Sequence, residues 1–136
     1  MAGFVLDASV TLSWLLDDEI NAKADQALHA LAELGAIVPT LWHMEVRNAM
    51  LMAVRRNRIT LDDTKIRLAS LKDLPIVTDL EPQFDAAFDL GNQYTLTLYD
   101  AMYLELALRK QIPLVTLDGY LNKAATSDAG AGLPTL

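Results

Sequence analysis

Short apolar runs alternate along this chain with longer amphipathic stretches, and this alternation limits the possible folds more than any other feature. Each run has the length of a buried strand, whereas the stretches between them have the length and periodicity of helices. This order is typical of βα units, in which helices cover both faces of a parallel sheet. We therefore expect an α/β fold: a three-layer α/β/α sandwich, Rossmann-like in its layering, with a central parallel sheet of four to five strands.

The element boundaries follow from the same pattern. The expected strands are 3–7, 36–39, 75–78, 113–117 and a short edge strand at 133–135. The expected helices are 9–16, 20–34, 41–57, 60–73, 81–92, 98–110 and 118–125. Helix starts are indicated at Thr40, Thr60 and Thr97, because a threonine hydroxyl accepts well from free amides of a first turn. Gly35 is expected to end the second helix, and Gly91-Asn92 the fifth.

Length and composition restrict the class of protein. The chain has 136 residues, which fits one domain spanning 1–136. Without cysteine it has no disulfide, no thiolate zinc site and no thiol nucleophile, and its two histidines leave oxygen as the main metal ligand. We find neither a signal peptide nor an apolar run long enough to span a membrane, so we expect a soluble cytoplasmic protein without a membrane partner.

The charge is informative but does not decide the partner. A net charge of −7 disfavours non-specific wrapping of nucleic acid, which needs clustered cations. Arg55, Arg56 and Arg58 nevertheless form a basic cluster that could meet a phosphate backbone, or that could simply suit the C-terminus of a helix.

Four acidic residues stand where an open parallel sheet gathers its site. Asp7 ends one expected strand and Asp118 directly follows another, while Glu45 and Asp100 lie near the starts of expected helices. All four can face one crevice at the carboxyl edge of the sheet. Two carboxylates about 4 Å apart repel by about 4 kcal/mol at an effective dielectric of 20, so such a cluster calls for a cation. Mg²⁺ or Mn²⁺ would remove the repulsion and supply phosphate chemistry.

Each acid also has a purely structural explanation. Asp7 and Asp118 could be N-caps of the helices that follow them. Thr97 and Asp100 have the spacing of a capping box. Glu45 is harder to explain in this way, because it interrupts an otherwise apolar helix face.

Four short segments carry a resemblance to a known family. They are Val5-Leu6-Asp7-Ala8-Ser9, Glu45-Val46-Arg47-Asn48-Ala49, Tyr99-Asp100-Ala101-Met102-Tyr103-Leu104-Glu105-Leu106-Ala107 and Val115-Thr116-Leu117-Asp118. In order and spacing the chain resembles PIN-domain proteins, specifically the VapC-type toxin ribonucleases of toxin–antitoxin pairs.

The resemblance implies a metal-dependent endoribonuclease with an acidic pocket. Its metal ligands and catalytic residues would be Asp7, Glu45, Asp100 and Asp118, supported by Ser9, Thr116 and Asn48. Mg²⁺ or Mn²⁺ would bind there, and two ions about 3.5–4 Å apart would allow in-line attack without a histidine base. The implied partners are an RNA substrate, a cognate VapB-type antitoxin and a second copy of the chain in a homodimer.

Two other functions fit parts of the pattern. A non-catalytic PIN-like module that binds protein or RNA would use its acids only as helix caps and would be indifferent to metal. A phosphoacceptor or phosphatase domain fits less well, because Asp7-Ala8-Ser9 lacks a second spaced acid and no lysine follows the last strands.

Overall fold

The central sheet has four parallel strands. A computed structural model of the chain describes residues 1–16, 20–127 and 130–136. In it the strands take the order β3-β2-β1-β4. They are β1 (Phe4–Leu6), β2 (Ala36–Pro39), β3 (Ile76–Asp79) and β4 (Leu114–Val115). The expected α/β class and parallel sheet are therefore confirmed.

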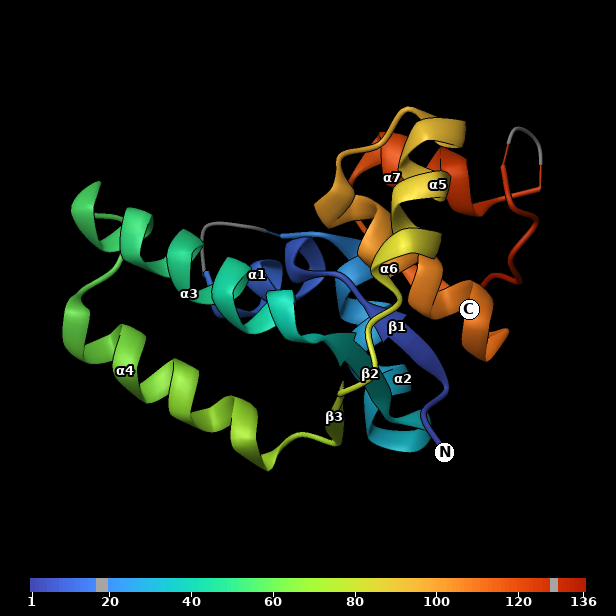
Figure 1. Cartoon of the computed structure of the whole chain (residues 1–136). Helices are drawn as coiled ribbons and strands as arrows, with labels where there is room; N and C mark the ends of the chain where they lie inside the picture. The colour runs from blue at the N-terminus through green and yellow to red at the C-terminus, as the bar shows by residue number, and fades with distance from the viewer. Residues whose placement is uncertain (17–19, 128–129) are drawn as a thin grey trace.

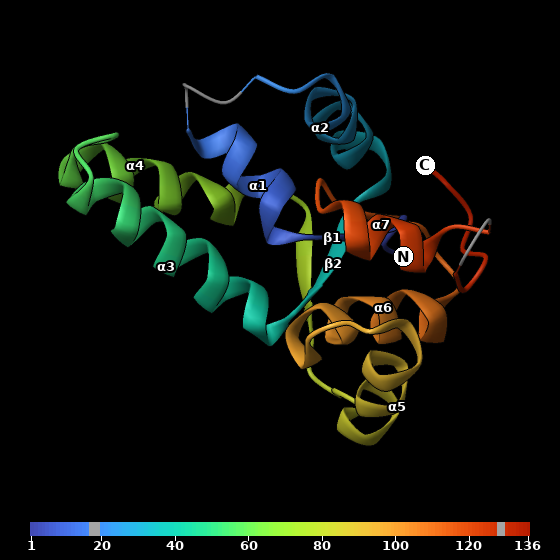
Figure 2. The ribbon, with the colours of Figure 1, turned by 90° about the horizontal axis from the view of Figure 1, so that it is seen from above.

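Seven α-helices are found among the described residues. They are α1 (Ala8–Leu15), α2 (Ala22–Leu34), α3 (Thr40–Arg55), α4 (Leu61–Ser70), α5 (Phe84–Tyr94), α6 (Leu98–Lys110) and α7 (Gly119–Ala125), with a short 3₁₀ turn η1 (Leu71–Asp73) after α4. Helices α5 and α6 lie on one side of the sheet, and α1 and α2 lie on the other (Figure 2). The α3–α4 hairpin extends beyond one end of the sheet (Figure 1). No helix within the described ranges is long and apolar enough to cross a membrane.

The core is built around the first strand and the sixth helix. All three residues of β1 are fully buried, because this strand has a neighbour on each side and helices on each face. In α6 every residue from Ala101 to Ala107 is buried. Large apolar side chains in such positions each stabilise the fold by about 1.5–3 kcal/mol. The core thus fixes the strand that Asp7 directly follows and the helix that carries Asp100.

The expected strand at 133–135 is wrong. Leu133 is buried, but its amide donates to the carbonyl of Ala125 at 2.8 Å, so this segment packs beside the end of α7 rather than against the sheet. Pro134 has no amide proton with which to join a ladder. The sheet therefore stops at four strands.

Helices begin at or directly after all three predicted threonines, but only two of the threonines act as caps. The hydroxyls of Thr60 and Thr97 accept from the amides of Asp63 and Asp100, each at 3.1 Å. Thr40 is instead the first helical residue of α3, and Pro39 occupies the cap position. Proline suits this place because it has no amide to leave unsatisfied at a helix start.

Glycine has different roles in α2 and α5. Gly35 ends α2 with a φ of 68°, as expected. Gly91 does not end α5, which continues to Tyr94. A Cβ on Gly91 would lie 3.2 Å from the carbonyl oxygen of Leu96 and 3.5 Å from Cβ of Ala101, so this glycine permits the close approach of α5 to α6.

The chain order reverses direction between β1 and β4. From β1 the chain moves outward to β2 and β3, then returns to place β4 on the other side of β1. In open parallel sheets the carboxyl ends of the strands at such a reversal are where a binding crevice is usually found. Asp7 directly follows β1, and Thr116 to Asp118 follow β4.

Candidate active site

Two hydroxyls hold the carboxylate of Asp7. Ser9 Oγ and Thr116 Oγ1 both donate to Oδ2 of Asp7, at 2.6 Å and 2.7 Å. Asp7 stands in the cap position of α1 but its side chain makes no cap bond, so the capping explanation does not account for it. Within the described residues Oδ1 of Asp7 receives no hydrogen bond, which leaves this oxygen for another ligand.

The same hydroxyls also shape the loop after β4. Ser9 Oγ accepts from the amide of Leu117, and Thr116 Oγ1 accepts from the amide of Asp118, both at 3.0 Å. Each hydroxyl donates its one hydrogen in the bond to Asp7 and accepts the backbone N–H bond with an oxygen lone pair. The position of Asp118 is therefore tied to that of Asp7.

Glu45 reaches the crevice from the second turn of α3. The phenol of Tyr103, a fully buried residue of α6, donates to Oε1 of Glu45 at 2.6 Å. Burial raises the pKa of Glu45, the bond from Tyr103 opposes this effect, and the charges of Asp7 and Asp100 raise the pKa further. Glu45 is thus half-buried beside two other carboxylates.

Asp100 lies in the first turn of α6. Burial raises its pKa first, and the charges of Asp118 and Asp7 raise it further, while a hydrogen bond with the Thr97 side chain lowers it. The capping explanation holds for its backbone, since its amide bonds to Thr97. The capping explanation does not account for the position of Asp100 near Asp118 and Asp7, whose charges raise its pKa.

Asp118 and Asn48 are the outer members of the predicted set. Oδ1 of Asp118 accepts from the amide of Leu121 at 3.1 Å and so caps α7, as the structural explanation predicted. The side chain is exposed, and its second oxygen can serve another partner. Asn48 is exposed on α3, and within the described residues no hydrogen bond joins it to the carboxylates.

The structure therefore places Asp7, Glu45 and Asp118 near enough to Asp100 for their charges to interact with it or with one another, without making a closed cage. In the described part of the chain, no group of three or more His, Asp and Glu side chains could by itself hold a metal ion. The donor set still suits Mg²⁺, which prefers oxygen, keeps several waters and usually takes only one or two carboxylates. A divalent cation would also relieve the repulsion that raises the pKa of Glu45 and Asp100.

Sequence reasoning gave no role to Tyr103, the phenol donor to Glu45. It follows Asp100 by three residues on α6, a spacing that places two side chains on one helix face. That spacing is the one feature of the sequence that could have indicated a role for Tyr103 beside Asp100. His43, by contrast, bonds through Nε2 to Thr78 Oγ1 at 2.8 Å and lies outside the carboxylate group.

A second acidic network in the protein is structural. Arg109 donates to both oxygens of Asp79, at 3.2 and 2.8 Å, and to both oxygens of Glu105, at 2.9 and 3.0 Å. The two carboxylates are only 9% and 5% exposed. The guanidinium lowers the pKa of Asp79, and both carboxylates raise that of Arg109. Both acids are therefore hydrogen-bonded to the same guanidinium within the protein, which explains their burial without a ligand.

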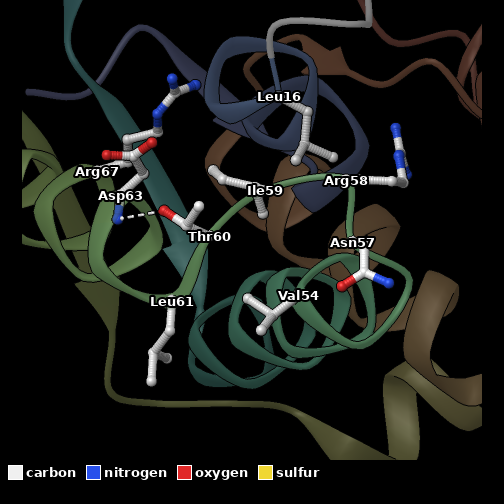
Figure 3. Close-up of a pocket in the computed structure, with 9 residues that line it drawn as sticks. All are labelled: Leu16, Val54, Asn57, Arg58, Ile59, Thr60, Leu61, Asp63 and Arg67. Carbon is white, nitrogen blue, oxygen red and sulfur yellow. Dashed lines mark hydrogen bonds between the residues drawn. The ribbon is translucent and has the colours of Figure 1, made fainter.

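The hollow beside the turn that joins α3 to α4 lies apart from the acids. Its volume is about 530 Å³, and Leu16 and Ile59 point toward one another at its centre (Figure 3). Val54, which also lines it, follows Glu45 by nine residues on α3, or ~14 Å at 1.5 Å per residue. This hollow does not belong to the carboxylate site.

Comparison with known proteins places the fold and the family. No curated protein matches the chain significantly. The crystal structure of PAE2754 from Pyrobaculum aerophilum is similar, with a TM-score of 0.72 and 22% identity over 96% of this chain and 88% of that one. Residues 4–126 match the PIN domain, whose members are generally nucleases that typically use divalent metal ions. The chain therefore belongs to the PIN-domain family, a nuclease-type superfamily.

Proposed function

We propose that the protein is an Mg²⁺- or Mn²⁺-dependent endoribonuclease and the toxin of a type II toxin–antitoxin pair. The observation that supports this most is the oriented carboxylate of Asp7, whose charge raises the pKa of both Glu45 and Asp100. The PIN-domain family supports phosphodiester hydrolysis. The toxin role is supported by the sequence resemblance to VapC-type proteins.

Different residues of the chain would bind the cation and orient the carboxylates that bind it. Asp7, Glu45, Asp100 and Asp118 would hold the cation. When bound, the cation supplies positive charge for the phosphodiester and lowers the pKa of a bound water. Ser9 and Thr116 fix the direction of the Asp7 carboxylate, and Tyr103 fixes that of Glu45. Such fixed supporting bonds commonly contribute 10–100-fold in affinity or activity.

The hydrolysis reaction itself does not distinguish RNA from DNA. Hydrolysis of this kind does not use the ribose 2′-hydroxyl, so the discrimination would rest on shape and on contacts to an unpaired strand. A structured RNA such as tRNA or rRNA, or an mRNA, would offer suitable single-stranded loops.

Two protein partners are part of the proposal. An antitoxin with a basic segment would suit the acidic pocket. A second copy of the chain would suit an exposed apolar patch beside a hollow of about 390 Å³. The patch comprises Met44, Phe84, Phe88, Leu98 and Tyr99, each at least 44% exposed. Contiguous apolar surface of this kind commonly marks an interface.

The homodimer is testable in the purified protein. Phe88→Asp should shift the mass measured by light scattering toward the monomer. Ile66→Asp, an equally exposed position on α4, should leave the mass unchanged. A monomeric wild type would remove the homodimer from the proposal.

The rival function is a non-catalytic PIN-like binding module. Incubation of the protein with single-stranded RNA and Mg²⁺ or Mn²⁺ distinguishes the two. Cleavage should require metal, should be lost in Asp7→Asn, and should survive in Asp62→Asn, an exposed acid at the start of α4. Absence of cleavage by the wild type, or equal cleavage by Asp7→Asn, would favour the binding module. Growth arrest on expression, relieved by Asp100→Asn, would support the toxin role.

A further inference from the structure

We infer that a trough beside the carboxylate site binds an RNA nucleotide flanking the one that is cut, and that Arg56 contacts its phosphate. The inference rests on the proposed function and adds a substrate-binding subsite to it. The trough is a cavity of about 500 Å³ between α1 and α3. Its near end is formed by Ser9 and Leu117, and its far end by Arg56 and Arg58.

The near end of the trough is part of the carboxylate site. Ser9 Oγ donates to Asp7 at 2.6 Å and accepts from the amide of Leu117 at 3.0 Å. A strand whose phosphate lies at Asp7 would therefore pass Ser9 as it enters the trough.

Helix α3 connects the two ends in a straight line. Glu45, Ala49, Met52 and Arg56 are spaced by four, three and four residues, so they lie on one face of the helix. Eleven residues separate Glu45 from Arg56, or ~16 Å at 1.5 Å per residue. One phosphate cannot meet both ends, so an anion at Arg56 belongs to a different nucleotide from the one at the carboxylates.

The lining of the trough suits a nucleotide. Leu12 and Met52 give it an apolar floor for a base or ribose, and the exposed Arg56 gives its far end a positive charge. Most protein contacts to a nucleic acid strand go to phosphate and sugar, and arginine is a common donor. The protein carries a net charge of −7, so this local cationic end is where a polyanion would first be attracted.

The charge also favours RNA over a peptide as the occupant. A basic antitoxin segment would meet like charge at Arg56, although it would suit the carboxylates. Arg58 already interacts within the protein, so the test is built on Arg56, which is exposed at the end of α3. Arg55 offers a matched control, because it is the adjacent arginine, is also exposed, and does not line the trough.

The experiment measures binding of a fluorescein-labelled oligoribonucleotide of about 12 nucleotides by anisotropy, a length that covers the site of a typical single-strand binder. Arg56→Gln should weaken binding about five- to tenfold and should reduce the slope of log K against log salt by about 0.7. Arg55→Gln should have less than half that effect. Ala49→Leu, which fills the trough without changing charge, should weaken binding similarly but leave the salt slope unchanged.

Substrate length gives a second readout. Cleavage of a dinucleotide, too short to reach Arg56, should be unchanged in Arg56→Gln, whereas the KM for the longer RNA should rise. Equal binding and equal KM in the Arg55→Gln and Arg56→Gln variants would overturn the inference and leave the nuclease proposal intact. A wild type that binds RNA through Arg56 but cuts none would overturn the nuclease proposal and leave the RNA-binding trough intact. If Arg56→Gln altered only the binding of a basic peptide, the trough would be a protein site and the inference wrong.

Discussion

The hydroxyl of Thr116 donates a 2.7 Å hydrogen bond to Oδ2 of Asp7, joining the ends of two neighbouring strands across 109 residues of sequence. Both residues are buried, with Thr116 fully so. A bond to a carboxylate in such surroundings is stronger than one between neutral groups. It fixes the direction of the Asp7 carboxylate before any ligand arrives.

Loss of this hydroxyl should impair the site more than the fold. Thr116→Val keeps the side-chain shape but removes the donor to Asp7 and the acceptor for the Asp118 amide. We expect RNA cleavage and Mn²⁺ affinity to fall about 10–100-fold. The control is Thr64→Val, because Thr64 is also buried but its hydroxyl bonds to the Thr60 carbonyl within α4. Equal activity in the two variants would show that Thr116 does not position Asp7 for the reaction.

Neutralising Glu45 should stabilise the metal-free protein. Its pKa is raised by burial and by neighbouring carboxylates, so the folded state holds the proton more tightly than the unfolded chain does. Stability therefore rises as pH falls from neutral toward the unfolded value near 4.3, and is lowest when Glu45 is charged. Glu45→Gln, which keeps an acceptor for Tyr103, should raise the neutral-pH Tm by about 2–4 °C in a chelator.

Thermal melting from pH 4.5 to pH 8 checks this. The gain from Glu45→Gln should shrink toward the acid end, while Glu33→Gln, at an exposed position of α2, should leave the neutral-pH Tm nearly unchanged. A lower Tm for Glu45→Gln at neutral pH would contradict the repulsion that we infer among the carboxylates.

Tyr103→Phe should move the pH profile of cleavage. The phenol donates to Glu45 at 2.6 Å and lowers the pKa of that carboxyl, so its removal raises the pKa further. The acid limb of the rate profile should then shift to higher pH, with a smaller loss on the alkaline side. Tyr94→Phe, on the neighbouring helix α5, serves as the control. A uniform loss of rate at every pH would indicate a packing defect instead.

The Arg109 network should matter for stability rather than for activity. Arg109→Leu would leave Asp79 and Glu105 buried without a counter-charge, which typically costs about 3–5 kcal/mol. Because the pKa of Asp79 is lowered in the folded state, its contribution is present above the unfolded value near 3.9 and is lost as pH falls through the folded value. Urea denaturation should therefore show the difference between the wild type and Arg109→Leu shrinking below about pH 4. Arg47→Leu, an exposed arginine of α3, should cost little at any pH.

Much of the fold could be predicted from pattern alone. The strand ending before Asp7 and the helix beginning after Thr97 are encoded locally, by an apolar run and by a hydroxyl cap. The misassigned elements depended on tertiary contacts. Gly91 suggested a helix end, but its role is to let α5 approach Ala101, and Leu133 suggested a strand, but it packs beside α7.

The positions of the four acids could be predicted from local sequence patterns, but their hydrogen-bond partners could not. Strand ends and helix starts placed the four acids at one edge, which periodicity and topology rules can do. They could not reveal that Asp7 is held by two hydroxyls while Asp118 caps α7, because hydrogen-bond partners depend on side-chain directions. Nor could they find the Asp79 and Arg109 pair, which joins β3 to the end of α6 across 30 residues.

The most direct test of the central claim is Mn²⁺-dependent melting of the wild type and of an Asp7→Asn, Asp100→Asn double variant. If the carboxylates form a metal site, Mn²⁺ at 100 times its Kd should stabilise the wild type by about 2.7 kcal/mol and leave the double variant unchanged. Equal shifts in both proteins, or no shift in either, would contradict a metal site at these residues.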